Sequence, residues 1–300
     1  MEIISKGVNK VYKVKKGLFK YQEISVIKDF NYKITQGEII GLIGINNSGK
    51  SVTINLLSGR ETPTSGKIYI DGEVDYKKLK DNCEIINDFN KWKLLASETI
   101  YNNLLHFGKK FKLNNLDVEK KITELRDIFE FDKIINKRIE ELSFLDLVKL
   151  NISISMLRNP FVLFFDSALE DLDYVSKSTI LKLLKRLNKE FKTTIVIASD
   201  DLMDIEKICK RISIIKKGKV VIDGEYECIK KEYLNHKIVS ISFSKSFNVP
   251  KGDFTVVEAS DYYVRIRIDF NKYDFASLIN QFDINTIVDI NISSDYLSRF

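Results

Sequence analysis

One octapeptide, GINNSGKS at Gly44–Ser51, constrains the fold of this 300-residue chain more than any other stretch. It fits the phosphate-binding loop pattern G-x-x-x-x-G-K-[ST] at every fixed position. An apolar, β-favouring segment precedes it at 38–43, and residues 52–57 follow with the apolar spacing of a helix that stops at Gly59. Strand, glycine loop and helix in this order predict a site for a nucleoside triphosphate.

The chemistry of such a loop assigns roles to its residues. Backbone N–H groups of the loop and of the helix start would surround phosphate oxygens. Lys50 would bridge the β- and γ-phosphates, and the Ser51 hydroxyl would hold Mg²⁺. The nucleotide-binding residues predicted from this segment are Gly44, Asn46, Asn47, Ser48, Gly49, Lys50, Ser51 and Val52.

Composition restricts the class of protein. Apolar residues make up 44% of the chain, enough for ordinary cores, yet the longest unbroken apolar run is Phe161–Phe165, far too short to span a membrane. The first ten residues carry no apolar stretch of the kind found in secretion signals, and three scattered cysteines do not make a disulfide framework or a zinc site. We therefore expect a cytosolic protein.

The net charge of +6 comes mostly from lysines that alternate with acidic residues. A basic balance can indicate nucleic acid or an anionic membrane surface as partner. No basic cluster with interleaved aromatic residues is present, so a solvated surface is the favoured interpretation and no nucleic-acid partner is expected.

Further motifs follow the phosphate loop in a fixed order. They read TPTSGKIYIDG at 62–72, IEELS at 139–143, NPFVLFFD at 159–166, and a strand–helix–strand stretch at 193–225. In this order the chain resembles the nucleotide-binding subunit of ABC-type transporters over residues 1 to about 230. The resemblance implies an α/β P-loop NTPase fold of the ABC type, with ATP and Mg²⁺ as cofactors.

The resemblance also implies a domain organisation. Residues 1–235 correspond to the ABC-type nucleotide-binding domain, with a helical subdomain at about 75–157. From 236 to 300 the character changes, because apolar residues alternate with polar ones at a spacing of two, as in half-buried strands. With a helix expected at 273–282, this part is predicted to be a small α+β domain that carries no recognisable chemistry.

Three more residues acquire roles from the resemblance. Tyr12 stands where the family stacks an aromatic ring on adenine, although an isolated strand tyrosine is more often a packing residue. Asp166 follows an apolar strand and is placed to hold Mg²⁺ through water, as the Walker-B aspartate does. Ser143 keeps the hydroxyl that reaches the γ-phosphate across a dimer interface. Asn47 replaces a usual glycine, and asparagine tolerates the left-handed backbone region better than most residues.

The groups that the family uses for hydrolysis are replaced. Ser167 stands in place of the glutamate that polarises the attacking water, and Asp200 in place of the switch histidine. Asp88 is the best candidate for the position of the water-linking glutamine. The signature segment reads LSFLD at 142–146 instead of LSGGQ, so that Asp146 adds a negative charge at a helix start. No catalytic residue of the family is intact, which predicts weak hydrolysis or none.

The expected function is that of an ATP-binding subunit working with transmembrane permease subunits on the inner face of the cell membrane. A second, active ABC ATPase subunit is the expected partner in a heterodimer. One alternative is an active ATPase that drives transport as a homodimer. A nucleic-acid-associated ABC protein ranks lower, since such proteins usually carry two cassettes and this chain has one phosphate loop. The sequence does not indicate the transported substrate or the direction of transport.

Overall fold

A computed structural model describes residues 1–16, 21–87, 93–200, 202, 206–231, 236–270 and 273–294. Asp88, predicted to replace the water-linking glutamine, lies outside the described residues. The chain divides into two compact units, Met1–Asp223 and Gly224–Phe300, and each is treated by itself. The domain boundary at 235 and 236 stays a prediction.

The first unit is built on a six-stranded sheet in the order β5-β6-β7-β3-β8-β9. Its strands are β3 (Ile39–Ile43), β5 (Cys83–Ile86), β6 (Val162–Asp166), β7 (Thr194–Ser199), β8 (Arg211–Lys216) and β9 (Lys219–Glu225). The pairs β5/β6, β6/β7, β7/β3 and β3/β8 are parallel. Strands of a parallel sheet are buried on both faces, which explains the unbroken apolar run at the start of β6.

The register of this sheet positions the site. Ile43 at the end of β3 pairs with Ser199 at the end of β7, and Asp166 at the end of β6 pairs with Ala198. The carboxyl ends of three strands therefore meet at one edge. The phosphate loop, Asp166 and Asp200 all follow directly at that edge.

A second sheet, antiparallel and three-stranded, has the order β2-β1-β4. Its strands are β1 (Glu2–Lys15), β2 (Tyr21–Thr35) and β4 (Ser65–Ile70). The sequence pattern favours shorter strands, at 2–12 and 29–34, than the structure has. Both extend further because they pair with each other along their whole length, down to Lys15 opposite Tyr21. Ile54 and Leu57 of helix α1 (Lys50–Leu57) belong to the buried apolar cluster that both sheets share.

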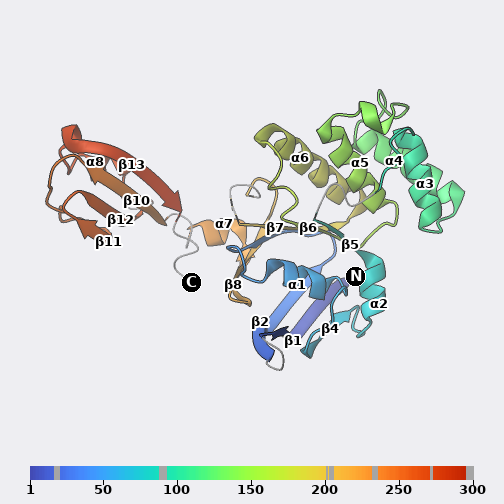
Figure 1. The fold of residues 1–300 in the computed structure, drawn as a ribbon, viewed down its shortest axis with the longest axis horizontal. Coiled ribbons are helices and arrows are strands. Elements are labelled where there is room, and N and C mark those ends of the chain that lie inside the picture. The colour runs from blue at the N-terminus through green and yellow to red at the C-terminus, as the bar shows by residue number, and fades with distance from the viewer. Residues whose placement is uncertain are drawn as a thin grey trace. The chain divides into compact units, whose positions relative to one another are not determined.

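The remaining helices of the first unit are α2 (Tyr76–Asn82), α3 (Ile100–Lys110), α4 (Asn115–Ile128), α5 (Phe144–Met156) and α6 (Tyr174–Phe191). Figure 1 shows α3, α4 and α5 grouped together, apart from β1, β2 and β4. The apolar spacing at 119–131 and 142–157 predicts two helices, and the structure has α4 and α5 there with shifted ends. Among the described residues, no helix is long and apolar enough to cross a lipid bilayer.

The second unit contains a four-stranded antiparallel sheet in the order β11-β12-β10-β13. Its elements are α7 (Tyr226–Ile229), β10 (His236–Phe243), β11 (Thr255–Ser260), β12 (Tyr263–Asp269), α8 (Phe275–Ile279) and β13 (Ile287–Ser294). Leu278 of α8 packs in a buried cluster with Val239, Ile241 and Ile266 of the sheet. Helix α8 is shorter than the predicted 273–282, and β11 was not predicted because its residues are exposed and do not alternate in burial.

Candidate nucleotide-binding site

The phosphate loop leaves β3 and turns tightly into α1. Gly44 has no room for a side chain, because a Cβ atom there would lie 2.4 Å from the Ser48 Oγ and 2.5 Å from the carbonyl oxygen of Ile215. Asn47 adopts a left-handed backbone with φ of 64°, the conformation that asparagine was expected to tolerate. The loop therefore closes with asparagine at this position.

The start of α1 is open to an anion. Gly49 occupies the N-cap position with φ of 107° and supplies no side-chain cap, and the first turn has no acidic residue. Ser48 is buried, and its Oγ atom has no hydrogen-bond partner within the described part of the chain. Free N–H groups and the positive end of the helix dipole are the donors that a phosphate group requires.

Lys50 lies over the loop rather than in solvent, and its residue is only 7% exposed. Its ammonium donates hydrogen bonds to the carbonyl oxygens of Gly44, at 2.5 Å, and of Ile45, at 3.4 Å. Burial lowers the pKa of Lys50, while the charges of Asp200, Glu170 and Asp166 act in the opposite direction. The loop thus holds the ammonium close to its own backbone.

Ser51 and Asp166 meet although 115 positions separate them in the chain, and the Ser51 Oγ donates a hydrogen bond of 2.9 Å to Asp166 Oδ1. Burial raises the pKa of Asp166, whereas the bond from Ser51 and the charge of Lys50 lower it. Within the described ranges no three His, Cys, Asp or Glu side chains could hold a metal by themselves. One hydroxyl and one carboxylate fit Mg²⁺, which usually takes its other ligands from phosphate oxygens and water.

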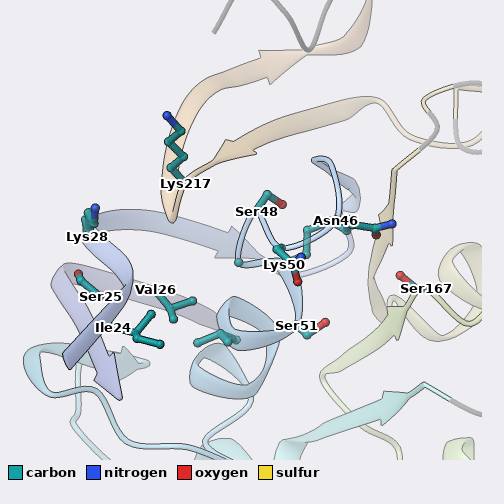
Figure 2. Close-up of a pocket in the computed structure, with 13 residues that line it drawn as sticks. Ile24, Ser25, Val26, Lys28, Asn46, Ser48, Lys50, Ser51, Ser167 and Lys217 are labelled. Carbon is teal, nitrogen blue, oxygen red and sulfur yellow. The ribbon is translucent and has the colours of Figure 1, made fainter. Parts of the chain in front are cut away.

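A cavity of about 720 Å³ opens beside the loop (Figure 2). It is lined by Ile24, Ser25, Val26, Lys28, Asn46, Asn47, Ser48, Gly49, Lys50, Ser51, Val52, Ser167 and Lys217. Five of these, from β2 and from the turn after β8, were not predicted from the sequence. The alternation of Ile24, Val26 and Lys28 at a spacing of two was the available signal, since such residues share one face of a strand.

Tyr12 does not line this cavity as the structure describes it. Its hydroxyl donates a hydrogen bond of 2.6 Å to Glu61 Oε2, and the ammonium of Lys10 lies 5.1 Å from the centre of its ring. Burial and the neighbouring carboxylate raise the pKa of Tyr12 to about 12. Its backbone pairs with Ile24, which does line the cavity, so Tyr12 is next to the site in the hairpin. Adenine stacking on Tyr12 stays a prediction.

Ser167 and Asp200, which stand in place of the family's hydrolytic residues, follow β6 and β7 at the same edge of the six-stranded sheet. Ser167 lines the cavity with a left-handed φ of 57°, and its N–H donates to the carbonyl oxygen of Ala198 at 3.3 Å. Asp200 is close enough to Lys50 for its charge to raise the pKa of the ammonium. Glu170 acts on Lys50 in the same way and was missed from the sequence, where it is one of several acidic residues in a turn.

The signature segment is not part of this cavity among the described residues. Ser143 is the N-cap of α5, where its Oγ accepts a hydrogen bond of 3.2 Å from the Asp146 N–H. The same hydroxyl donates to Asp146 Oδ2 at 2.6 Å, and Asp146 Oδ1 lies 3.9 Å from the ammonium of Lys149. The Ser143 hydroxyl is therefore already committed to a carboxylate of its own chain.

Fold and loop together define a P-loop NTPase of the ABC type. Residues 27–170 match the family described as ABC transporter. The chain thus contains an ABC transporter ATP-binding domain, homologous to the MetN and CbiO ATPase subunits. This result confirms the predicted fold class.

The curated relatives include methionine import ATP-binding proteins from different bacteria. The methionine import ATP-binding protein MetN of Francisella tularensis is 35% identical over 208 residues, which cover 67% of this chain and 59% of that protein. A MetN of Staphylococcus epidermidis is 31% identical over 227 residues, covering 73% and 64%. The chain thus spans less than two thirds of the length of these relatives.

Solved structures show the same likeness. CbiO1 from Clostridium perfringens, part of the ABC transporter complex cbiONQ, superposes with a TM-score of 0.66 at 25% identity, over 77% of this chain and 91% of that one. The ATP-binding cassette MJ0796, a dimer bound to ADP and Pi, superposes with a TM-score of 0.58 at 25% identity, over 74% and 98%.

Proposed function

We propose that this chain is the ATP-binding subunit of an ABC transporter complex, that it holds Mg-ATP on its phosphate loop, and that its own site hydrolyses ATP poorly. The observation that carries the proposal is that Lys50, Ser51 and Ser167 line the same cavity. The first two are the groups that binding needs. The third is a hydroxyl where a base would be needed for hydrolysis.

The binding step follows from the residues at the sheet edge. The open start of α1 and the Lys50 ammonium would neutralise the triphosphate, in a cavity whose lining includes no carboxylate among the described residues. Ser51 and Asp166 would exchange their mutual hydrogen bond for the metal and its water shell. When bound there, Mg²⁺ would neutralise part of the charge of the triphosphate.

Hydrolysis would lack its proton acceptor. At neutral pH the Ser167 hydroxyl is not a base, and loss of a general base costs about 10²–10⁴ in rate. Asp200 adds a negative charge near Lys50, where the γ-phosphate would lie. A carboxylate about 4 Å from a phosphate charge costs about 4 kcal/mol at an effective dielectric near 20. The site would therefore bind the nucleotide but hydrolyse it slowly.

The relatives support a place for this chain in a membrane complex. Two of them are named import ATP-binding proteins, and CbiO1 is part of a transporter complex. By the same likeness we propose that this chain docks on transmembrane permease subunits at the inner face of the membrane. A second ATPase subunit would supply the intact catalytic groups and signature that this chain lacks.

Phosphate release by the purified full chain tests the impaired site. The wild type should release phosphate slowly, and Ser167→Glu should raise the rate by less than about tenfold, because Asp200 would still repel the γ-phosphate. Ser167→Ala is the matched control and should leave the rate unchanged. A wild-type turnover of tens per second that Lys50→Ala abolishes would contradict the proposal and support an active homodimer.

Subunit counting by mass spectrometry of the native complex tests the assembly. The expected composition is permease subunits, this chain and a second ATPase that carries a glutamate after its Walker-B aspartate. A transport-competent complex with this chain as its only ATP-binding subunit would contradict that composition.

A further inference from the structure

Three carboxylates surround the Lys50 ammonium, and metal binding accounts for only one of them. Asp166 accepts the hydrogen bond of 2.9 Å from the Ser51 hydroxyl, and these two groups are the ones that fit Mg²⁺. Burial lowers the pKa of Lys50, and the charges of Asp200, Glu170 and Asp166 oppose it in that order of size. Two of the three charges therefore act on the ammonium without belonging to the metal site.

The backbone holds Asp200 beside the phosphate loop. Strands β3 and β7 pair in register up to Ile43 and Ser199, the residue before Asp200. The N–H of Gly44 then donates to the carbonyl oxygen of Ser199 at 3.3 Å. The carbonyl oxygen of Gly44 accepts the hydrogen bond of 2.5 Å from the Lys50 ammonium. Asp200 thus leaves β7 next to the residue that holds the ammonium.

Glu170 comes from the turn after β6. Its N–H donates to the carbonyl oxygen of Ser167 at 3.1 Å, and Ser167 itself lines the cavity (Figure 2). Asp171 follows directly and is exposed like Glu170, yet its charge is not among those of the described residues that act on Lys50. The turn therefore places Glu170, and not Asp171, within electrostatic reach of the ammonium.

These carboxylates bear unequally on the phosphates of a nucleotide. The N–H groups of such a loop bind the α- and β-phosphates, whereas its lysine reaches the β- and γ-phosphates. The γ-phosphate therefore depends on the metal and on Lys50, whose charge it would share with Asp200 and Glu170. Since like charges repel, the two carboxylates should weaken the hold on a γ-phosphate more than that on a β-phosphate.

We propose that Asp200 and Glu170 cancel the affinity that a γ-phosphate would add, so that the site binds Mg-ADP about as tightly as Mg-ATP. The proposal rests on the proposed binding of adenine nucleotide at the phosphate loop and concerns that same site. A site of this kind stays occupied by either nucleotide and does not respond to the ratio of ATP to ADP. With slow hydrolysis, its occupancy would hold the subunit in one nucleotide-bound form.

Calorimetric titration of the full chain in the presence of Mg²⁺ tests this, with ADP and the β,γ-imido analogue of ATP as ligands. The wild type should bind both with affinities within about threefold of each other. Asp200→Asn and Asp200→Ala should strengthen the triphosphate at least about tenfold and leave ADP little changed. The alanine variant shows that the gain comes from the lost charge and not from a new amide donor. Glu170→Gln should give a smaller gain, about threefold, because an exposed charge is screened.

Two control variants keep the charges near Lys50. Asp200→Glu retains the carboxylate and should bind the two nucleotides as the wild type does. Asp171→Asn removes an exposed charge from the same turn as Glu170 and should also keep the wild-type ratio. A raised preference for the triphosphate in Asp171→Asn would contradict the assignment to Glu170, since any charge in the turn would then have the same effect.

The failures of this proposal can be told apart from a failure of the site. A wild-type preference of about tenfold or more for the triphosphate would overturn the cancellation. Asp200 variants that strengthen ADP as much as the triphosphate would also overturn it, because the carboxylate would then act on the whole phosphate chain. If Lys50→Ala left both affinities unchanged, the proposed nucleotide site itself would be wrong.

Discussion

Two helix starts in the first unit, those of α1 and α5, are expected to face a phosphate group, yet they are capped differently. The α1 start has Gly49 as N-cap, no side-chain cap and no acidic residue in its first turn. The α5 start has Ser143 as N-cap, bonded to the Asp146 N–H and carboxylate. One end leaves its donors for a ligand, and the other satisfies them within the chain.

The contrast shows how an ABC-type fold can keep a phosphate-binding helix start at α1 and lose the contact that the start of α5 would make to a phosphate. A helix start has free N–H groups and a partial positive charge that an anion stabilises. At α1 that anion must come from outside, which suits a phosphate. At α5 the carboxylate of Asp146 already takes the place of the anion, so a phosphate from another subunit would meet a negative charge and a committed hydroxyl.

The largest expected effect tests the open end. Lys50→Ala should weaken Mg-ATP binding by about tenfold to a hundredfold, because a hydrogen bond to a charged group contributes about 1.5–3 kcal/mol. Titration with a fluorescent ATP analogue measures the change. Lys219→Ala, an exposed lysine of the β8–β9 hairpin, is the control and should bind like wild type. Unchanged affinity in Lys50→Ala would remove the loop from the binding site.

The close packing around Gly44 in the phosphate loop is tested by measuring the stability of a variant. Gly44→Ala should lower the free energy of unfolding of the first unit by about 2–3 kcal/mol, because its Cβ would overlap Ser48 and Ile215. Gly72→Ala is the control, since a Cβ there has nothing within 4 Å and only its φ of 83° is unfavourable for alanine. Its loss should be about 1 kcal/mol. Equal losses in urea unfolding would show that the loop has room to adjust.

The start of α5, where Ser143 bonds to Asp146, is tested by removing the charge of Asp146. Asp146→Asn should lower the free energy of unfolding by about 1 kcal/mol, since the helix start loses a negative charge and the bond from Ser143 loses its charge assistance. Asp171→Asn is the matched control, an exposed aspartate with no hydrogen bond or ion pair to the described residues. If both variants had the same stability, Asp146 would not act as the internal anion of α5.

The smallest expected effect concerns pH. Burial raises the pKa of Asp166 above the 3.8 of an ordinary aspartate, and the protonated form has no charge to attract a metal. Mg²⁺ binding with ATP should therefore weaken as the pH falls, and the weakening should begin at a higher pH than for an ordinary aspartate. Magnesium titrations over a pH series measure it. Asp166→Asn should lose this part of the pH dependence and keep only that of the nucleotide.

The sequence by itself determined the features that depend on consecutive residues. The loop at Gly44–Ser51 is a run of backbone conformations, and its glycines, lysine and serine specify them in order. The helix start of α5 and the apolar strand β6 are equally local, since a cap acts within one turn and a buried strand is predicted from its own side chains. Hence the family resemblance and the fold could be predicted.

Tertiary structure decided which distant residues meet. Ser51 reaches Asp166 because β3 and β6 lie in one parallel sheet with aligned ends, and the register that aligns them appears in no single segment. Lys28 and Lys217 share a cavity with the loop because one turn packs on β2 through Gly218. Local sequence specifies the conformation of a segment, whereas the neighbours of a side chain depend on how sheets and turns pack.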